Sequence, residues 1–131
     1  MVVNDNLEKR QLVRLLCNED FSSSRLNYEG TVYILQSINF HHQGMGLFDS
    51  NRLPDEKQCT ISFSYKDNDE LIEIHELPCI VLHSHETDTG NQYGIQFITE
   101  TMTPDVFNKL LSIEASLLAQ EDIGDRYGLC N

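Results

Sequence analysis

Basic residues are scarce in this chain. Nine Lys and Arg stand against twenty-one Asp and Glu among 131 residues, which gives a formal net charge of -12. A surface that follows the phosphates of DNA or RNA needs a basic face, and so few basic residues do not readily form one. The composition therefore argues against a nucleic-acid polymer as partner, although a small anionic ligand needs only a few well-placed donors.

Long apolar runs are also missing. No stretch approaches the ~20 apolar residues that span a bilayer, and the first ten residues lack the apolar core of a signal peptide. A chain of this length is sufficient for one ordinary domain. We therefore expect a single domain that stays in the cytoplasm, with no membrane insertion.

The motifs of common enzymes and redox proteins are not found either. The four cysteines are widely spread and form no CxxC pair: Cys17, Cys59, Cys79 and Cys130. In a cytoplasmic chain such thiols are expected to be reduced and mostly buried. A nucleophile elbow, an acid–base motif and a glycine-rich phosphate loop are absent, so we expect neither an enzyme nor a cofactor.

The histidines offer a remote alternative, a metal-binding β-barrel. His83 and His85 form an HxH pair that shares one face of a predicted strand, whereas the adjacent His41 and His42 point to opposite faces. Zinc needs three or four converging ligands, and no second ligand pair has a recognisable spacing. Ordinary surface histidines are the simpler interpretation, and we assign no metal ligands.

Short strand signals fill the middle of the chain. The predicted strand segments are 30–35, 45–48, 59–65, 71–74, 78–85 and 93–98, with 71–85 read either as one long bent strand or as two short ones. In the segment 59–65 the apolar residues alternate with period two and share one face. This pattern, followed by a helix, favours a mainly β fold, a small antiparallel barrel with a C-terminal α-helix.

The helix signal begins at Thr103, the expected N-cap, with Pro104 at the first helical position. The apolar residues that follow form one helical stripe, which we expect to pack onto the sheet: Phe107, Leu110, Leu111, Ile113, Leu117 and Leu118. The predicted organisation is an N-terminal arm over residues 1–15, a barrel with its helix over 16–120, and a flexible acidic tail over 121–131.

Two polar clusters carry the functional signal. Arg10 and Arg14 are two planar, permanently charged forks that can close on one anion or stack on a flat ring. Asn39 presents a donor and an acceptor suited to a base edge, and Gly44 can take positive φ or let a ligand approach the backbone. Taken separately, a solvated basic patch and a plain β-turn or bulge explain these clusters as simply.

Taken together, the clusters resemble the PilZ domain family. That family carries RxxxR in an N-terminal arm, here Arg10 to Arg14, and later (D/N)xSxxG at a strand junction, here Asn39-x-His41-x-x-Gly44. The segment 93–97 is similar to the family's late G-[VI]-x-F strand, and a helix follows as in the family. The resemblance covers about residues 8–118.

The resemblance implies a six-stranded antiparallel barrel that serves as a receptor for the bacterial second messenger cyclic di-GMP. It implies that Arg10 and Arg14 neutralise phosphate, stack on guanine and donate to the guanine edge. It also implies that Asn39 pairs with a guanine edge and that Gly44 keeps the strand junction open. Ligand would order the arm and signal to an effector protein of the flagellar, pilus or polysaccharide machinery.

One residue departs from the family pattern. His41 stands where the family has Ser, and its ring is larger and can titrate near neutral pH. The alternative function is therefore a PilZ-like protein-interaction module that binds no nucleotide. His41 favours that alternative and the arginine pair opposes it; we favour nucleotide binding, with His41 among the ligand-binding residues.

Overall fold

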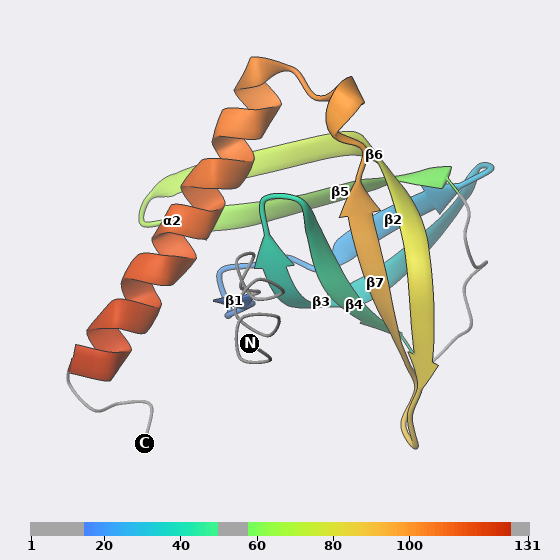
Figure 1. The fold of residues 1–131 in the computed structure, drawn as a ribbon, viewed down its shortest axis with the longest axis horizontal. Helices are drawn as coiled ribbons and strands as arrows, with labels where there is room; N and C mark the ends of the chain where they lie inside the picture. Colours follow the sequence, from blue (N-terminus) through green and yellow to red (C-terminus); the bar gives the residue numbers. More distant parts are fainter. Residues whose placement is uncertain (1–14, 50–57, 127–131) are drawn as a thin grey trace, which may run out of the picture.

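Strands dominate the fold. The computed structural model describes residues 15–49 and 58–126, so that residues 1–14, 50–57 and 127–131 lie outside the description. The strands are β1 Leu15–Leu16, β2 Ser24–Tyr28, β3 Thr31–His41, β4 Gly44–Asp49, β5 Gln58–Asp67, β6 Glu70–Glu86 and β7 Asn91–Phe97. A 3₁₀ turn, η1 (Thr99–Thr101), leads into the helix α2 (Pro104–Arg126), as Figure 1 shows.

Six strands close into an antiparallel barrel, which confirms the predicted fold class. Neighbours run in the order β3, β2, β5, β6, β7 and β4, and β4 pairs with β3 to complete the circle. The short β1 extends the same sheet, because Leu15 pairs with Phe40 and Leu16 with Asn39 on β3.

Two strand features depend on positive φ angles at residues other than glycine. In the β2–β3 turn, Glu29 and Gly30 have φ angles of 49° and 86°, the sign pattern of a type I′ hairpin. In β6, Glu76 has a φ of 46°, and its N–H donates to Ser62 Oγ at 2.8 Å. The strand bends there without ending, so the segment 71–85 is one long bent strand.

The core lies inside the barrel and under the helix. As the alternation predicted, Cys59, Ile61, Phe63 and Tyr65 all point inward and are buried. The rings of Phe63 and Phe97 stack at 6.4 Å with an interplanar angle of 18°. Burial of aromatic and aliphatic side chains from every barrel strand supplies the main stabilisation.

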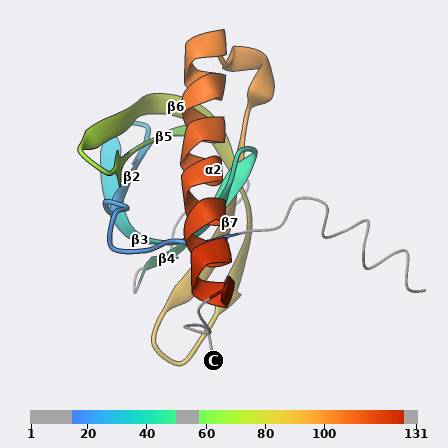
Figure 2. The ribbon, with the colours of Figure 1, turned by 90° about the vertical axis from the view of Figure 1, so that its left-hand side faces the viewer.

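The helix begins as predicted, with Thr103 Oγ1 accepting a hydrogen bond from Val106 N–H at 3.2 Å. The predicted stripe, however, packs only in part. Leu110, Ile113 and Leu117 are buried, whereas three of its members remain exposed: Phe107, Leu111 and Leu118. Figure 2 shows the helix as one straight rod in front of the strands, and only the central arc of its wide stripe is covered. The helix runs to Arg126, past the predicted start of the tail at residue 121.

No helix in the described part of the chain is long and apolar enough to cross a membrane.

Candidate functional site

A bulge in β3 sets the direction of the predicted site residue Asn39. Ser37 pairs with Leu47 and Asn39 with Gly46, so Ile38 is the extra residue in β3. Such a bulge shifts the side-chain alternation by one position. Leu35 and Phe40 are both buried although they are five positions apart, an odd spacing that would put them on opposite faces of a regular strand. Asn39, next to the inward-facing Phe40, is thereby turned to the outer side of the barrel.

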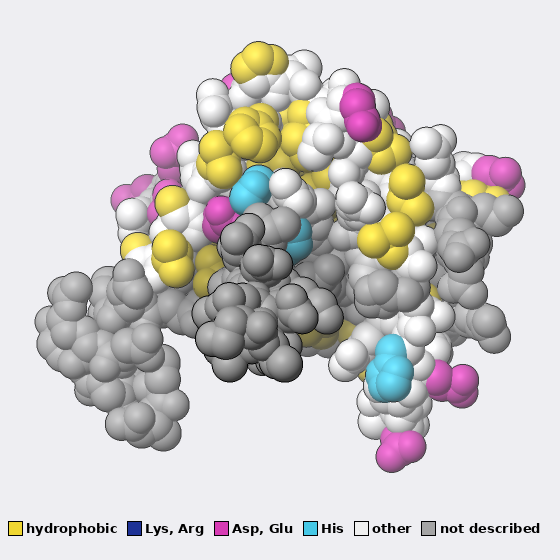
Figure 3. All heavy atoms as spheres, viewed as in Figure 1, with side chains coloured by type: hydrophobic (Ala, Val, Ile, Leu, Met, Phe, Trp, Pro, Cys, Tyr) yellow, Lys and Arg dark blue, Asp and Glu magenta, His cyan; other side chains and the backbone are white. Residues whose placement is uncertain are grey.

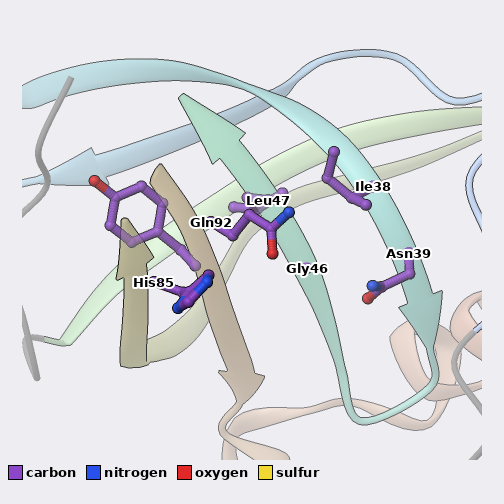
Figure 4. A pocket seen from close by; sticks show the side chains of 7 residues that line it. Ile38, Asn39, Gly46, Leu47, His85 and Gln92 are labelled. Atoms are coloured by element: carbon purple, nitrogen blue, oxygen red, sulfur yellow. The ribbon is translucent and has the colours of Figure 1, made fainter. Parts of the chain in front are cut away.

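Asn39 lines a small pocket of about 90 Å³ on that outer side (Figure 4). Its other lining residues come from β3, β4, β6 and β7: Ile38, Gly46, Leu47, His85, Gln92 and Tyr93. The sequence did not predict Gly46 or Gln92 as site residues. Gly46, two residues after the motif's Gly44, reaches Asn39 through the β3–β4 pairing. Gln92 arrives through the pairing of β4 with β7, and no local motif marks it.

Gly46 and Asn39 are in unusually close contact. A Cβ at Gly46 would lie 2.7 Å from Asn39 Oδ1 and 2.9 Å from Asn39 Nδ2, so a side chain there would displace the amide. Asn39 Oδ1 is buried and has no hydrogen-bond partner among the described residues. A buried acceptor without a partner is costly, and a ligand donor would relieve that cost.

The other two residues of the predicted motif lie at the tip of the β3–β4 hairpin. His41 is 7% exposed, and its Nδ1 accepts a hydrogen bond from Gln43 N–H at 3.0 Å. His41 and Gly44 line a second pocket of about 200 Å³, together with Leu82. Gly44 does not have positive φ. A Cβ there would clash with the carbonyl oxygen of Ile95, so close packing against β7 accounts for this glycine.

The helix holds the hairpin tip in place. Glu114 accepts a hydrogen bond from His42 N–H at 2.9 Å and lies 3.0 Å from His42 Nδ1. The ring of Phe107 meets the His42 ring edge-on at 6.1 Å. Sequence reasoning missed Glu114, because 72 residues separate it from His42 and no local signal distinguishes it from an ordinary solvent-facing carboxylate of the helix. This contact fixes the turn that joins Asn39 and His41 to Gly44.

Arg10 and Arg14, the other half of the predicted site, lie outside the described residues. The description begins at Leu15, one residue after Arg14. The first described residues, Leu15 and Leu16, pair with Phe40 and Asn39 on β3.

The described residues of the pocket carry no Lys or Arg. Side chains are described for three of the nine basic residues, Arg25, Lys66 and Lys109, and none of them lines this pocket. On the face shown in Figure 3, acidic, histidine and hydrophobic side chains are seen and no described Lys or Arg is visible. The pocket walls themselves offer amide and imidazole groups.

A metal centre gains no support within the described ranges. No group of three His, Cys, Asp or Glu side chains in residues 15–49 and 58–126 is placed to hold an ion. Three described histidines have other contacts: His41 with Gln43, His42 with Glu114, and His75, whose Nε2 lies 2.8 Å from Glu73 Oε2.

Comparison with known proteins bears on the fold. Neither models of protein families nor curated protein sequences match this chain. Among solved structures, the PilZ domain of YcgR from Escherichia coli, with c-di-GMP, superposes with a TM-score of 0.62 at 11% identity, covering 92% of this chain and 98% of that one. This chain has a PilZ-like fold. The Bacillus subtilis inhibitor of motility, MotI/DgrA, superposes on the PilZ-like chain with a TM-score of 0.65 at 13% identity. That match covers 86% of this chain, which spans about half of MotI/DgrA (52%).

Proposed function

We propose that this PilZ-like domain is a cyclic di-GMP receptor module that signals to a partner protein. The observation that carries the proposal is the pairing of Leu15 and Leu16 with Phe40 and Asn39. Leu15 follows Arg14 directly in the sequence, so in this proposal the RxxxR arm begins beside the pocket that holds the unsatisfied Asn39 acceptor. The two motif halves, 25 residues apart in the sequence, would then bind the ligand together.

The polar groups of the pocket and the arginines of the arm are chemically complementary to a guanine nucleotide. Guanine presents an N2 amino donor, which Asn39 Oδ1 is able to accept, and its O6 and N7 acceptors suit an arginine fork. The pocket has no described cation, so neutralisation of two phosphates depends on Arg10 and Arg14 from the arm. His85 and Gln92 supply further polar edges at the pocket wall.

The neighbours support the same proposal at the level of the fold. One of them is a PilZ domain with c-di-GMP, and the other is an inhibitor of motility. By analogy, the partner of this chain is a protein of the bacterial flagellar, pilus or polysaccharide machinery, and the domain acts in the cytoplasm. A binding domain of this kind is not an enzyme.

Calorimetry with cyclic di-GMP tests the proposal directly. We expect binding tighter than about 100 μM for the full chain, roughly the weakest affinity that such a signal could use. Arg14→Ala should abolish most of the binding, since it removes a charged fork. Arg25→Ala is the matched control: it removes the same charge from an exposed position on β2, away from the pocket residues. Equal affinities in the two variants would refute the proposed clamp.

The proposed mechanism is an ordering of the arm. Ligand held by Arg10 and Arg14 draws the arm against the Asn39–Gly44 segment, and this rearrangement forms or hides a surface for the partner. Hydrogen exchange of residues 5–16 should therefore slow when cyclic di-GMP binds. Exchange that is equally fast with and without bound ligand would contradict the mechanism.

His41 favours the second candidate, a docking module that binds no nucleotide. Its ring is buried in the hairpin and fills space that the smaller Ser of the resembling family would leave open. If the ring only blocks the ligand, His41→Ser should bind cyclic di-GMP more tightly than the wild type. A loss of affinity in this variant would show that the ring contacts the ligand. No heat and no thermal shift for either protein would favour the docking module.

A further inference from the structure

Two cysteines face each other inside the barrel wall. Cys59 on β5 and Cys79 on β6 are direct cross-strand partners, and their sulfur atoms are 3.7 Å apart. A disulfide bond is about 2.05 Å long, so the sulfurs need to approach by less than 2 Å. The pair belongs to neighbouring strands of one sheet (Figure 1), and a small change of side-chain rotamer closes this gap.

The backbone at this position suits a disulfide. Pro78, next to Cys79, accepts a hydrogen bond from Ile98 N–H, so its backbone polar groups face β7. The backbone N–H and C=O groups of successive strand residues point to alternate sides, so those of Cys79 face β5. Cys59 and Cys79 then form a pair of the hydrogen-bonded type, with Cα atoms ~5.5 Å apart. This separation is typical of disulfides.

One of the two cysteines borders a surface pocket and the other is fully enclosed. Cys59 is 8% exposed and lines a pocket of about 330 Å³ together with Thr60, Ile98 and Thr101. Cys79 has no exposed surface. A small oxidant therefore reaches Cys59 first, and Cys79 stands behind it as the second thiol.

The pKa values of the two thiols also favour Cys59 as the more reactive one. The hydrogen bond between the two sulfurs lowers the pKa of Cys59 against the opposing effect of burial, whereas the same bond and burial both raise the pKa of Cys79. Cys17 provides a contrast, because burial raises its pKa to about 12. Since the thiolate is the reactive form, Cys59 is the favoured nucleophile of the described cysteines.

We propose that Cys59 and Cys79 form a reversible oxidation site, at which a peroxide closes an intrachain disulfide between β5 and β6. The Cys59 thiolate attacks one peroxide oxygen, the O–O bond breaks, and Cys59 becomes a sulfenic acid while the other oxygen leaves and takes up a proton as water. The sulfur of Cys79 then attacks the sulfur of Cys59. Its thiol proton leaves with the departing hydroxide as a second water, so that two thiols and one hydrogen peroxide give one disulfide and two waters. A small thiol in excess reopens the bond by exchange.

Peptide mapping of the full chain tests the site. After hydrogen peroxide treatment of the folded chain and alkylation in denaturant, tryptic digestion should yield residues 58–66, with Cys59, linked to residues 67–109, with Cys79. The linked species should have lost two hydrogens and should disappear after treatment with a small thiol, while Cys17 stays alkylated as the internal control. Separate, unlinked forms of the two peptides, or a link that a small thiol does not reopen, would overturn the proposal.

Two serine variants test the order of attack. In Cys79→Ser the sulfenic acid at Cys59 has no partner thiol, and a sulfenic-acid trap such as dimedone should label it. In Cys59→Ser the buried Cys79 should stay unlabelled under the same treatment. Labelling of Cys79 alone would overturn the assignment of Cys59 as the first site. If a variant fails to fold, the mapping of the wild-type chain still decides whether the disulfide forms.

Discussion

Replacing Gly46 by Ala should separate ligand binding from stability. The new Cβ would lie 2.7 Å from Asn39 Oδ1, closer than real Cβ contacts allow, so the Asn39 amide has to swing aside. An altered rotamer costs about 0.5–1.5 kcal/mol. The removal of a glycine from a strand returns about 0.5–1 kcal/mol. The two effects nearly cancel, and we expect the free energy of unfolding to stay within about 1 kcal/mol of the wild type.

Ligand affinity should respond much more strongly. A displaced Asn39 no longer presents its acceptor in the pocket, and one good base-edge contact is worth about 1–3 kcal/mol of discrimination. This loss corresponds to an affinity roughly 5- to 150-fold weaker, measured by calorimetry with cyclic di-GMP. Thermal unfolding of the same protein sample gives the stability change. Wild-type affinity in Gly46→Ala would refute the assignment of Asn39 as a ligand contact.

Gly44→Ala is the matched control, because it makes the same chemical change two residues away. There the added Cβ meets the backbone carbonyl of Ile95 and not a movable side chain. Strands β4 and β7 have to separate, and overpacking of this kind typically costs about 1–3 kcal/mol. We expect a clear fall in the thermal midpoint for this variant. Equal destabilisation at Gly44 and Gly46 would show that the Asn39 side chain cannot move as argued.

Three further outcomes follow from the contacts around the barrel. Glu114→Ala removes the acceptor of His42 N–H, and the free energy of unfolding should fall by about 1–2 kcal/mol in chemical denaturation. Glu114→Gln keeps an acceptor and should be destabilised less. Equal losses of stability in the two variants would contradict the hydrogen-bond argument. Thr103→Ala removes the helix cap and should cost about 1 kcal/mol, while Thr103→Ser should retain most of it. The pKa of Cys17 is raised to about 12 by burial, so its alkylation should be slow at neutral pH and speed up as the pH rises toward that value; fast labelling at pH 7 would show that Cys17 is not buried as described.

Local signals in the sequence were sufficient where one segment determines its own structure. The period-two pattern of 59–65 gave the inward face of β5, and Thr103 with Pro104 gave the start of α2. The β2–β3 hairpin was missed because its turn uses Glu29 at positive φ, outside the usual Asn-Gly and Asp-Gly signals. The helix stripe was overestimated, because the sequence carries no information on the curvature of the surface beneath it.

The candidate site was likewise predicted only where its residues form a local motif. Asn39 and Gly44 were recognised from a motif that is contiguous in the sequence, and the structure places both on one hairpin. Gly46 and Gln92 were not recognised, because Gly46 meets Asn39 only through the register of the bulged β3–β4 hairpin. Gln92 joins them only through the pairing of β4 with β7. Arg10 and Arg14 stay a prediction. They lie outside the described residues, and binding measurements decide what they hold.

The closure of the barrel has a consequence for folding order. The pairings β2–β3 and β3–β4 join segments close in the chain, as do β5–β6 and β6–β7, so residues 24–49 and 58–97 can each fold as a meander of hairpins. The two seams β2–β5 and β4–β7 join these halves at longer sequence separation, and such contacts form later because loop closure is costly. The Asn39 pocket straddles the β4–β7 seam, with walls from both meanders. A ligand of this pocket therefore binds the closed barrel, and by mass action it should shift the equilibrium toward the closed seam.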